Sequence, residues 1–400
     1  MTTRFGIFCP PAIGHLNPIC ALALELQRRG HSVTLFGVPD ALAKVEKLDL
    51  ATCEIGALDY PRGSIDRAYK TLGELTGRAG LKFTIDFFKR ETEMLFREAP
   101  EAIRAADIEM LIVDQVTSPI ATVADYLDLP FVTVCNAMLI HHEPAVPPYF
   151  THWAYSTTLW ARLRNRLGNA LVNFLTGDLW REICTQRCRW NLPACQKRDD
   201  SYSPLAQMCQ LPKAFDFPRE RLPAHFHYIV QNQRPEIFKC IAQACSTLEA
   251  QLVISLGHPE AQPIDLPGDP IVVPFAPHQR LIERSQVVVT HAGMNTVLTA
   301  LGCGVPLVAI PITNEQPGIA SRLARTKAGK TLQLSKLNEI TLRTAISEVL
   351  SESSYRDNAQ QLQKLIQASG GVKRAADIIE EAAQTRQPVM AKSVSDTERN

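Results

Sequence analysis

The stretch that decides the fold is residues 4–36, RFGIFCPPAIGHLNPICALALELQRRGHSVTLF. Its first apolar run predicts a buried strand over residues 4–9, and a second apolar run predicts another strand over residues 32–36. Between them, Asn17-Pro18 is typical of a helix start, because Asn is a favoured N-cap and Pro a favoured first helical residue. The stretch therefore predicts a strand–helix–strand unit.

The same pattern recurs further along the chain. Residues 110–113 and 131–134 are predicted strands, and Ser118-Pro119 opens a helix between them. Strands that alternate with helices predict an α/β protein with a parallel, doubly wound sheet. Ligands of such sheets bind beyond the carboxyl ends of the strands, where His15 and Asp114 both stand.

A second α/β series follows, so the 400 residues suit two Rossmann-like domains. Its predicted strands are residues 251–255, 271–273, 287–290 and 307–310, and terminal helices cover 353–384 with a break at Gly370-Gly371. The expected division is an N-terminal domain over 1–215, an extended linker over 216–234, a C-terminal domain over 235–384 and a disordered tail over 385–400.

Composition narrows the partners. With 42 basic and 41 acidic residues the net charge is +1, so no surplus of positive charge points to nucleic acid. The chain shows no signal peptide and no apolar run of about 18 residues. We expect a cytoplasmic protein, with peripheral membrane contact left open and the oligomeric state undetermined. The eleven cysteines are expected to be reduced thiols.

The strongest local motif is VVVTHAGMNTVL at residues 287–298. A buried strand, a short turn with Gly293 and a helix start follow one another. The free backbone N–H groups and the dipole of such a helix start form an anion site. His291, Asn295 and Thr296 add side-chain donors, so the motif predicts a phosphate site.

Two neighbouring loops extend this site. Glu315 and Gln316 follow the next strand, and their oxygens and amide suit the hydroxyls of a hexose. Phe275 ends an earlier strand, where a flat base could stack. Sites for a base, a diphosphate and a sugar together describe a nucleotide sugar.

The run from residue 275 to 316 resembles the donor-binding signature of the UDP-glycosyltransferases, which have the GT-B fold of two facing Rossmann-like domains. GHLNP at residues 14–18 is similar to the amino-terminal motif of the same family. The resemblance covers most of residues 4–380, is weakest across 145–200, and is closest to bacterial carotenoid (zeaxanthin) and macrolide-type members.

This resemblance implies an activity and a set of roles. The chain would transfer a hexosyl group from a UDP-sugar to a hydroxyl of a small lipophilic acceptor, with inversion and with neither metal nor cofactor. His15 would be the general base and Asp114 would orient it. The donor would be bound by Phe275, His278, Gln279, His291, Gly293, Met294, Asn295, Thr296, Thr299, Glu315 and Gln316.

The acceptor is expected near residues 141–200, an aromatic region that contains all four tryptophans. His141, Phe150 and Trp153 are the candidate acceptor residues. Two alternatives stay open: the region lines a pocket for an apolar ligand, or it is a lid packed on its own domain. His141 is also open to interpretation as a surface histidine, which the sequence alone favours.

Two departures from the family pattern bear on activity. Thr299 stands where the family has a Glu that binds the ribose, which predicts weaker donor binding. The first strand of the C-terminal domain is expected to be missing, unless residues 228–230 replace it. The chain is therefore either an active glycosyltransferase or a catalytically silent protein that binds a nucleotide sugar or a lipophilic ligand. A GT-B-fold epimerase is a third hypothesis, which has no need of the aromatic region.

Overall fold

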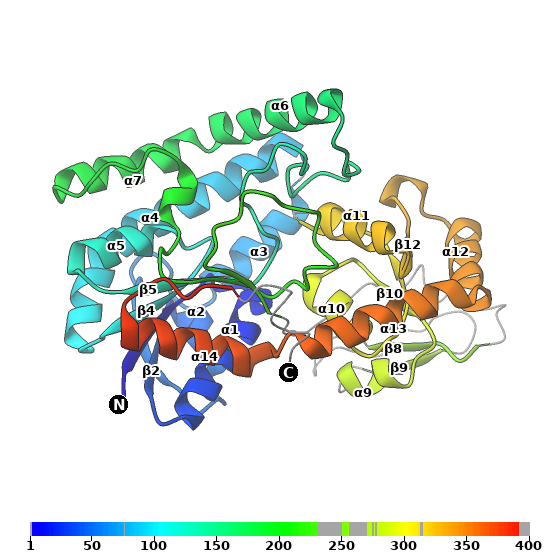
Figure 1. The fold of residues 1–400 in the computed structure, drawn as a ribbon, viewed down its shortest axis with the longest axis horizontal. Helices are drawn as coiled ribbons and strands as arrows, with labels where there is room; N and C mark the ends of the chain where they lie inside the picture. The colour runs from blue at the N-terminus through cyan, green and yellow to red at the C-terminus, as the bar shows by residue number, and fades with distance from the viewer. Residues whose placement is uncertain are drawn as a thin grey trace.

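The structure is a computed structural model that describes residues 2–75, 77–229, 250–255, 270–273, 276, 278–312 and 315–391. It shows two α/β domains side by side (Figure 1). In the described part of the chain, no helix is both long and apolar enough to cross a bilayer.

The N-terminal domain is built on a seven-stranded parallel sheet with the order β3-β2-β1-β4-β5-β6-β7. Its strands are β1 (Arg4–Phe8), β2 (Ser32–Gly37), β3 (Ala51–Glu54), β4 (Met110–Asp114), β5 (Phe131–Cys135), β6 (Gln207–Cys209) and β7 (Phe226–Tyr228). Every residue of β4 and β5 is buried, as the continuous apolar runs predict. The expectation of a doubly wound parallel sheet is confirmed.

Helices flank this sheet in two groups (Figure 1). The helices of this domain are α1 (Ile13–Arg28), α2 (Pro39–Val45), α3 (Ser64–Glu74), α4 (Gly77–Ala105), α5 (Pro119–Leu127), α6 (Leu159–Leu175) and α7 (Gly177–Arg189), with a 3₁₀ turn η1 (Arg198–Ser201). α4, α5 and α7 pack together, while α1 packs against the C-terminal helix of the chain. The 29-residue helix α4 has no counterpart in the sequence-based prediction.

The described part of the C-terminal domain has two smaller parallel sheets. They are β8 (Val253–Ser255) with β9 (Ile271–Val273), and β10 (Val288–Thr290), β11 (Leu307–Ala309) and β12 (Gly329–Thr331) in that order. The helices are α9 (His278–Glu283), α10 (Met294–Gly302), α11 (Gln316–Thr326), α12 (Glu339–Ser351), α13 (Ser353–Ala368) and α14 (Gly371–Thr385), with a 3₁₀ turn η2 (Leu334–Lys336). The sequence predicts that the first strand of this domain is missing, and most of the residues on which this prediction rests lie outside the described part.

Three parts of the chain differ from their prediction. The expected linker over 216–234 contains β7, which pairs with β6 in the first sheet. Tyr228 therefore belongs to the N-terminal sheet and does not replace a strand of the second domain. α14 returns to the N-terminal domain, where Arg29 of α1 bonds to Asp377 and Glu380 at 2.7 Å each. The start of the expected disordered tail is also ordered, because buried Val389 donates its N–H to Leu205 O (2.8 Å).

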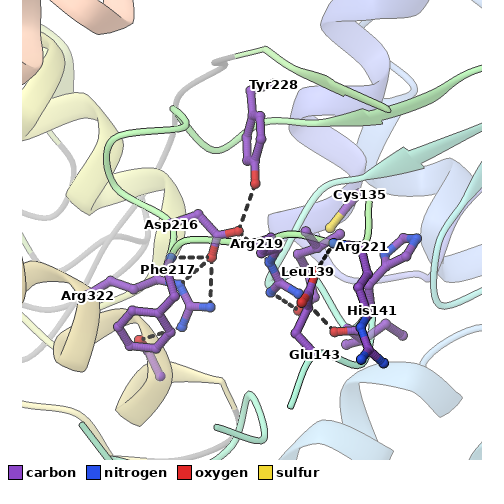
Figure 2. Close-up of polar contacts among 12 residues, drawn as sticks. Cys135, Leu139, His141, Glu143, Asp216, Phe217, Arg219, Arg221, Tyr228 and Arg322 are labelled. Atoms are coloured by element: carbon purple, nitrogen blue, oxygen red, sulfur yellow. Dashed lines mark hydrogen bonds and ion pairs between the residues drawn. The ribbon is translucent and has the colours of Figure 1, made fainter. Parts of the chain in front are cut away.

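A buried ion cluster joins the two domains (Figure 2). Asp216, between β6 and β7, binds Arg219 at 2.7 Å and Arg322 of α11 at 2.8 Å, and all three side chains are at most 1% exposed. Burial would raise the pKa of Asp216, but the charges of Arg219 and Arg322 outweigh it and hold the pKa at about 2. Tyr228 donates a further hydrogen bond to Asp216 (3.1 Å). The carboxylate thus holds α11 to the N-terminal domain.

Replacing Asp216 with Asn should destabilise the protein strongly, because two buried guanidinium groups would lose their counter-charge. We expect the free energy of unfolding to fall by about 3–5 kcal/mol, measured by urea denaturation. The matched control is Asp178→Asn, which breaks the exposed pair Arg181–Asp178 (2.8 Å) and should cost less than about 1 kcal/mol. Equal losses in the two variants would contradict a central role for the cluster.

Candidate active site and donor site

The fold brings His15 and Asp114 together. β1 and β4 are neighbours at the point where the strand order of the first sheet reverses, and this is where doubly wound sheets bind ligands. Asp114 ends β4, and His15 lies in the first turn of α1, directly after β1. His15 Nδ1 is 2.8 Å from Asp114 Oδ2.

Asp114 is fixed by further hydrogen bonds. Asn136 donates to its Oδ2 (2.8 Å), and the backbone N–H of Val116 donates to its Oδ1 (3.0 Å). The Asp114 side chain is 1% exposed, whereas that of His15 is 17% exposed. Because the carboxylate accepts a hydrogen bond from Nδ1–H, the neutral imidazole has its lone pair on Nε2. The pair thus presents a basic nitrogen with a defined tautomer.

The electrostatic surroundings of His15 favour its protonated form. Burial alone would lower the pKa of His15, but the charge of Asp114 and the hydrogen bond to it raise the pKa, with smaller contributions from Glu315 and Glu91. The net pKa therefore lies above its ordinary value of 6.5. Glu91, buried in α4, has its own pKa raised to about 7 by burial and by the charge of Asp114, against a lowering effect of His15.

The start of α1 differs from its prediction. The helix begins at Ile13 rather than at Asn17, and Pro18 lies inside it. Pro18 has no N–H to donate to the carbonyl of Gly14, one helical turn before it. That carbonyl instead accepts a hydrogen bond from Asn295 Nδ2 of α10 (3.3 Å). The helix that carries His15 is thereby bonded to the helix of the predicted phosphate site.

The start of α10 has the features of an anion site. Val297 donates to the Gly293 carbonyl (3.1 Å), so the backbone N–H groups of residues 294–296 are those that helix geometry leaves without an acceptor. A β-carbon at Gly293 would lie 2.7 Å from His291 Nε2, so the ring of His291 folds over this glycine. The structure therefore places the His291 ring directly beside the start of the helix.

Buried polar atoms with open hydrogen-bonding capacity surround the same turn. Thr290 Oγ1, Asn295 Oδ1 and Thr296 Oγ1 are buried and have no partner among the residues that the structure describes. Such atoms are costly in a folded protein unless a ligand or water satisfies them. Met294, by contrast, is buried in a hydrophobic core to which residues of both domains contribute.

Thr299 is buried inside α10. Its hydroxyl donates to the carbonyl of Asn295 (2.8 Å), one turn earlier in α10, and the residue is 0% exposed. Its side-chain hydrogen bond is therefore made within its own helix. The weaker donor binding expected from Thr299 stays a prediction.

The other predicted donor residues are only partly described. Phe275 lies outside the described residues, as does the side chain of His278, while Gln279 is exposed and donates to Glu283 (3.0 Å). Glu315 precedes α11 and is close enough to raise the pKa of His15. Gln316 Oε1 accepts from the Ile312 N–H (2.9 Å), which closes the loop before α11.

The predicted acceptor residues lie in different environments. His141 is buried rather than on the surface: its ring nitrogens contact Gln115 (3.1 Å) and Gln207 (2.8 Å), and the rings of Tyr202 and Phe226 pack against it. Phe150 is exposed, and the carbonyl of Trp153 accepts a hydrogen bond from Ser321 of α11 (3.2 Å). The segment around Trp153 thus contacts the C-terminal domain, whereas α7 of the same aromatic region packs on α4 and α5 of the N-terminal domain.

Three residues of this site were missed from the sequence. Asn136 stands at the carboxyl end of β5, so the strand-end rule that found Asp114 could also have found it. Glu91 gave no signal, because it lies in the middle of an unpredicted helix. Burial raises the pKa of the Tyr149 hydroxyl, and the carboxylate of Glu315 adds to this rise, so Tyr149 lies near Glu315.

Comparison with known proteins agrees with this architecture. A sequence model of the family described as UDP-glucoronosyl and UDP-glucosyl transferase matches residues 226–369. The chain is 30% identical to zeaxanthin glucosyltransferase of Pantoea ananas, over 98% of both chains, and 28% identical to that of Pseudescherichia vulneris, over 95% of this chain and 98% of the relative. The calicheamicin glycosyltransferase CalG4 superposes with a TM-score of 0.73 at 20% identity, covering 97% of this chain and 100% of CalG4.

The fold is therefore GT-B, the two-domain architecture of a large class of glycosyltransferases. The chain belongs to the UDP-glucuronosyl and UDP-glucosyl transferase family. It is a glycosyltransferase that uses a nucleotide-sugar donor.

The contact with Asp114 predicts how His15 titrates. In the wild-type protein, NMR titration of the ¹³C-labelled imidazole should give a pKa above 6.5. In Asp114→Asn the charge is lost while burial remains, so the pKa should fall below that of the wild type. His15→Gln identifies the resonance, and Asp178→Asn serves as the control that leaves it unchanged. An unchanged pKa in Asp114→Asn would contradict this electrostatic account.

Proposed function

We propose that this glycosyltransferase transfers a hexosyl group from a UDP-sugar to a hydroxyl of a small lipophilic acceptor, with inversion and without a metal, and that His15 is the general base. The observation that carries the proposal is the hydrogen bond between Gly14 O and Asn295 Nδ2 (3.3 Å). It supports the proposal because it brings the turn that carries His15 next to the first turn of α10, which belongs to the other domain.

In this proposal, His15 Nε2 takes the proton of the acceptor hydroxyl. The acceptor oxygen forms a bond to the anomeric carbon while the bond from that carbon to the diphosphate oxygen breaks, and UDP leaves. A single displacement inverts the anomeric centre. Asp114 holds the ring by Nδ1 and stabilises the imidazolium that forms.

The departing diphosphate is assigned to the start of α10. The N–H groups of residues 294–296 and the helix dipole stabilise negative charge there, and the Thr296 hydroxyl is available as a donor. Positioned donors of this kind stabilise charge that develops in the transition state without rearranging. His291 adds its ring at the same turn. These groups stabilise the negative charge of the departing diphosphate, which other enzymes do with a divalent cation.

The sugar is assigned to Glu315 and Gln316, and the acceptor to the side of Phe150 and Trp153. The names of the two relatives support a hydroxylated carotenoid such as zeaxanthin as the first acceptor to test. The proximity of Glu315 to both His15 and Tyr149 supports a position for the sugar between the base and the aromatic region.

The alternative is a catalytically silent member that binds a nucleotide sugar or a lipophilic ligand. It is favoured by Thr299, because its buried hydroxyl is already bonded to Asn295 O, within its own helix. The intact His15–Asp114 pair favours the active enzyme.

The test is release of UDP from UDP-glucose with and without zeaxanthin. The wild type should release UDP only when the acceptor is present, and His15→Ala should lower kcat by about 10²–10⁴-fold, the usual value of a general base. UDP affinity, measured by calorimetry, should be the same in both proteins. Undiminished turnover in His15→Ala would dismiss the base, whereas UDP binding without turnover by the wild type would support the silent alternative.

A further inference from the structure

Helix α6 turns a stripe of large apolar side chains toward solvent. We call Trp160, Leu163, Leu167, Leu171 and Phe174 the α6 stripe; Trp160 and Phe174 are each 81% exposed, and Leu167 is 63% exposed. Their spacing of three and four residues places them on one face of the helix. Exposed apolar side chains that are contiguous in this way mark an interaction surface.

The opposite face of α6 is the one that contacts the protein, and it is small and polar. Ala161 and Asn165 are its buried residues, and Asn165 Nδ2 donates to the carbonyl of Pro144 (3.1 Å). A β-carbon at Gly168 would lie 2.9 Å from the side chain of Pro148. The usual arrangement of an amphipathic helix is therefore reversed. Close packing of its small face fixes the outward direction of the α6 stripe.

Positive charge runs along the same helix. α6 contains Arg162, Arg164 and Arg166 and no acidic residue, and no Asp or Glu stands between Glu143 and Asp178. Arg162 and Arg166 are exposed and four residues apart, so they lie on one side of α6, between the α6 stripe and the face that contacts the protein. A second copy of α6 packed against the stripe would meet the same positive charge. An anionic surface would pair with it.

The position of α6 suits a flat partner. The helix runs along the outer edge of the N-terminal domain, and no other described helix lies beyond it (Figure 1). Its inner residues Asn169 and Val172 line a small cavity together with Tyr149 and Phe150. These aromatic residues belong to the segment assigned to the acceptor, so a surface that covers α6 would lie beside the acceptor side of the protein.

We propose that α6 binds the protein to the surface of a membrane that contains anionic lipids. The helix lies in the plane of the interface, with the α6 stripe among the acyl chains and Arg162 and Arg166 among the headgroups. A helix with Trp, Phe and Leu on one face and Arg beside them has the composition of interfacial helices. Binding then combines apolar burial with attraction to negative lipids. Neither contribution depends on the proposed reaction.

The experiment is co-sedimentation of the full chain with vesicles. The wild type should bind vesicles of mixed phosphatidylcholine and phosphatidylglycerol, and it should bind less to pure phosphatidylcholine or at high salt. Leu167→Ser with Phe174→Ser should weaken binding by about tenfold or more, because apolar surface is lost. Arg162→Gln with Arg166→Gln should remove the preference for the anionic lipid.

The matched control is Leu58→Ser with Ile340→Ser, which removes two exposed apolar side chains elsewhere (92% and 72% exposed) and should bind like the wild type. Unchanged thermal unfolding shows that each variant is folded. The proposal is overturned if the wild type binds no vesicles, if the serine variant of the α6 stripe binds as well as the wild type, or if that variant only dissociates a dimer in sedimentation velocity. Vesicle binding is measured without UDP release, so failure of the membrane proposal is distinguishable from failure of the proposed function.

Discussion

The arrangement of the site depends on one hydrogen bond that a proline makes available. An ordinary residue at position 18 would donate its N–H to the Gly14 carbonyl and complete the first turns of α1. Pro18 cannot, and Asn295 of the other domain takes that acceptor at 3.3 Å. The residue that follows Gly14 is His15, and Asn295 stands in the first turn of α10. A single backbone carbonyl therefore links the turn of the proposed base to the proposed anion site.

The two sides of this contact have opposite electrostatic character. Around His15 stand the carboxyl groups of Asp114, Glu91 and Glu315, which favour an imidazolium. The start of α10 instead offers backbone N–H groups and the positive end of its dipole. A proton would move toward the first side and a dianion would form on the second. The buried Asp216–Arg322 pair is a second contact that holds the domains together.

Much of the fold could be predicted because the buried strands read as uninterrupted apolar runs. β1, β4 and β5 were located from the sequence, and the strand-end rule then placed His15 and Asp114 in one site. Pro18 misled the prediction, since the preference of proline for a first helical position is local. It carries no information about a distant partner for the Gly14 carbonyl. The sequence does not indicate β7, because this strand has only three residues and stands in a proline-rich stretch. The outward face of α6 was also missed, since its pattern of apolar residues does not say which face is covered.

The most direct measurement is a crystal structure of the protein with UDP. We expect β-phosphate oxygens within about 2.7–3.2 Å of the backbone nitrogens of residues 294–296, with His15 Nε2 directed toward that phosphate from the opposite domain. A nucleotide bound elsewhere, a first turn of α10 closed by protein side chains, or an imidazole turned away from the phosphate would contradict it.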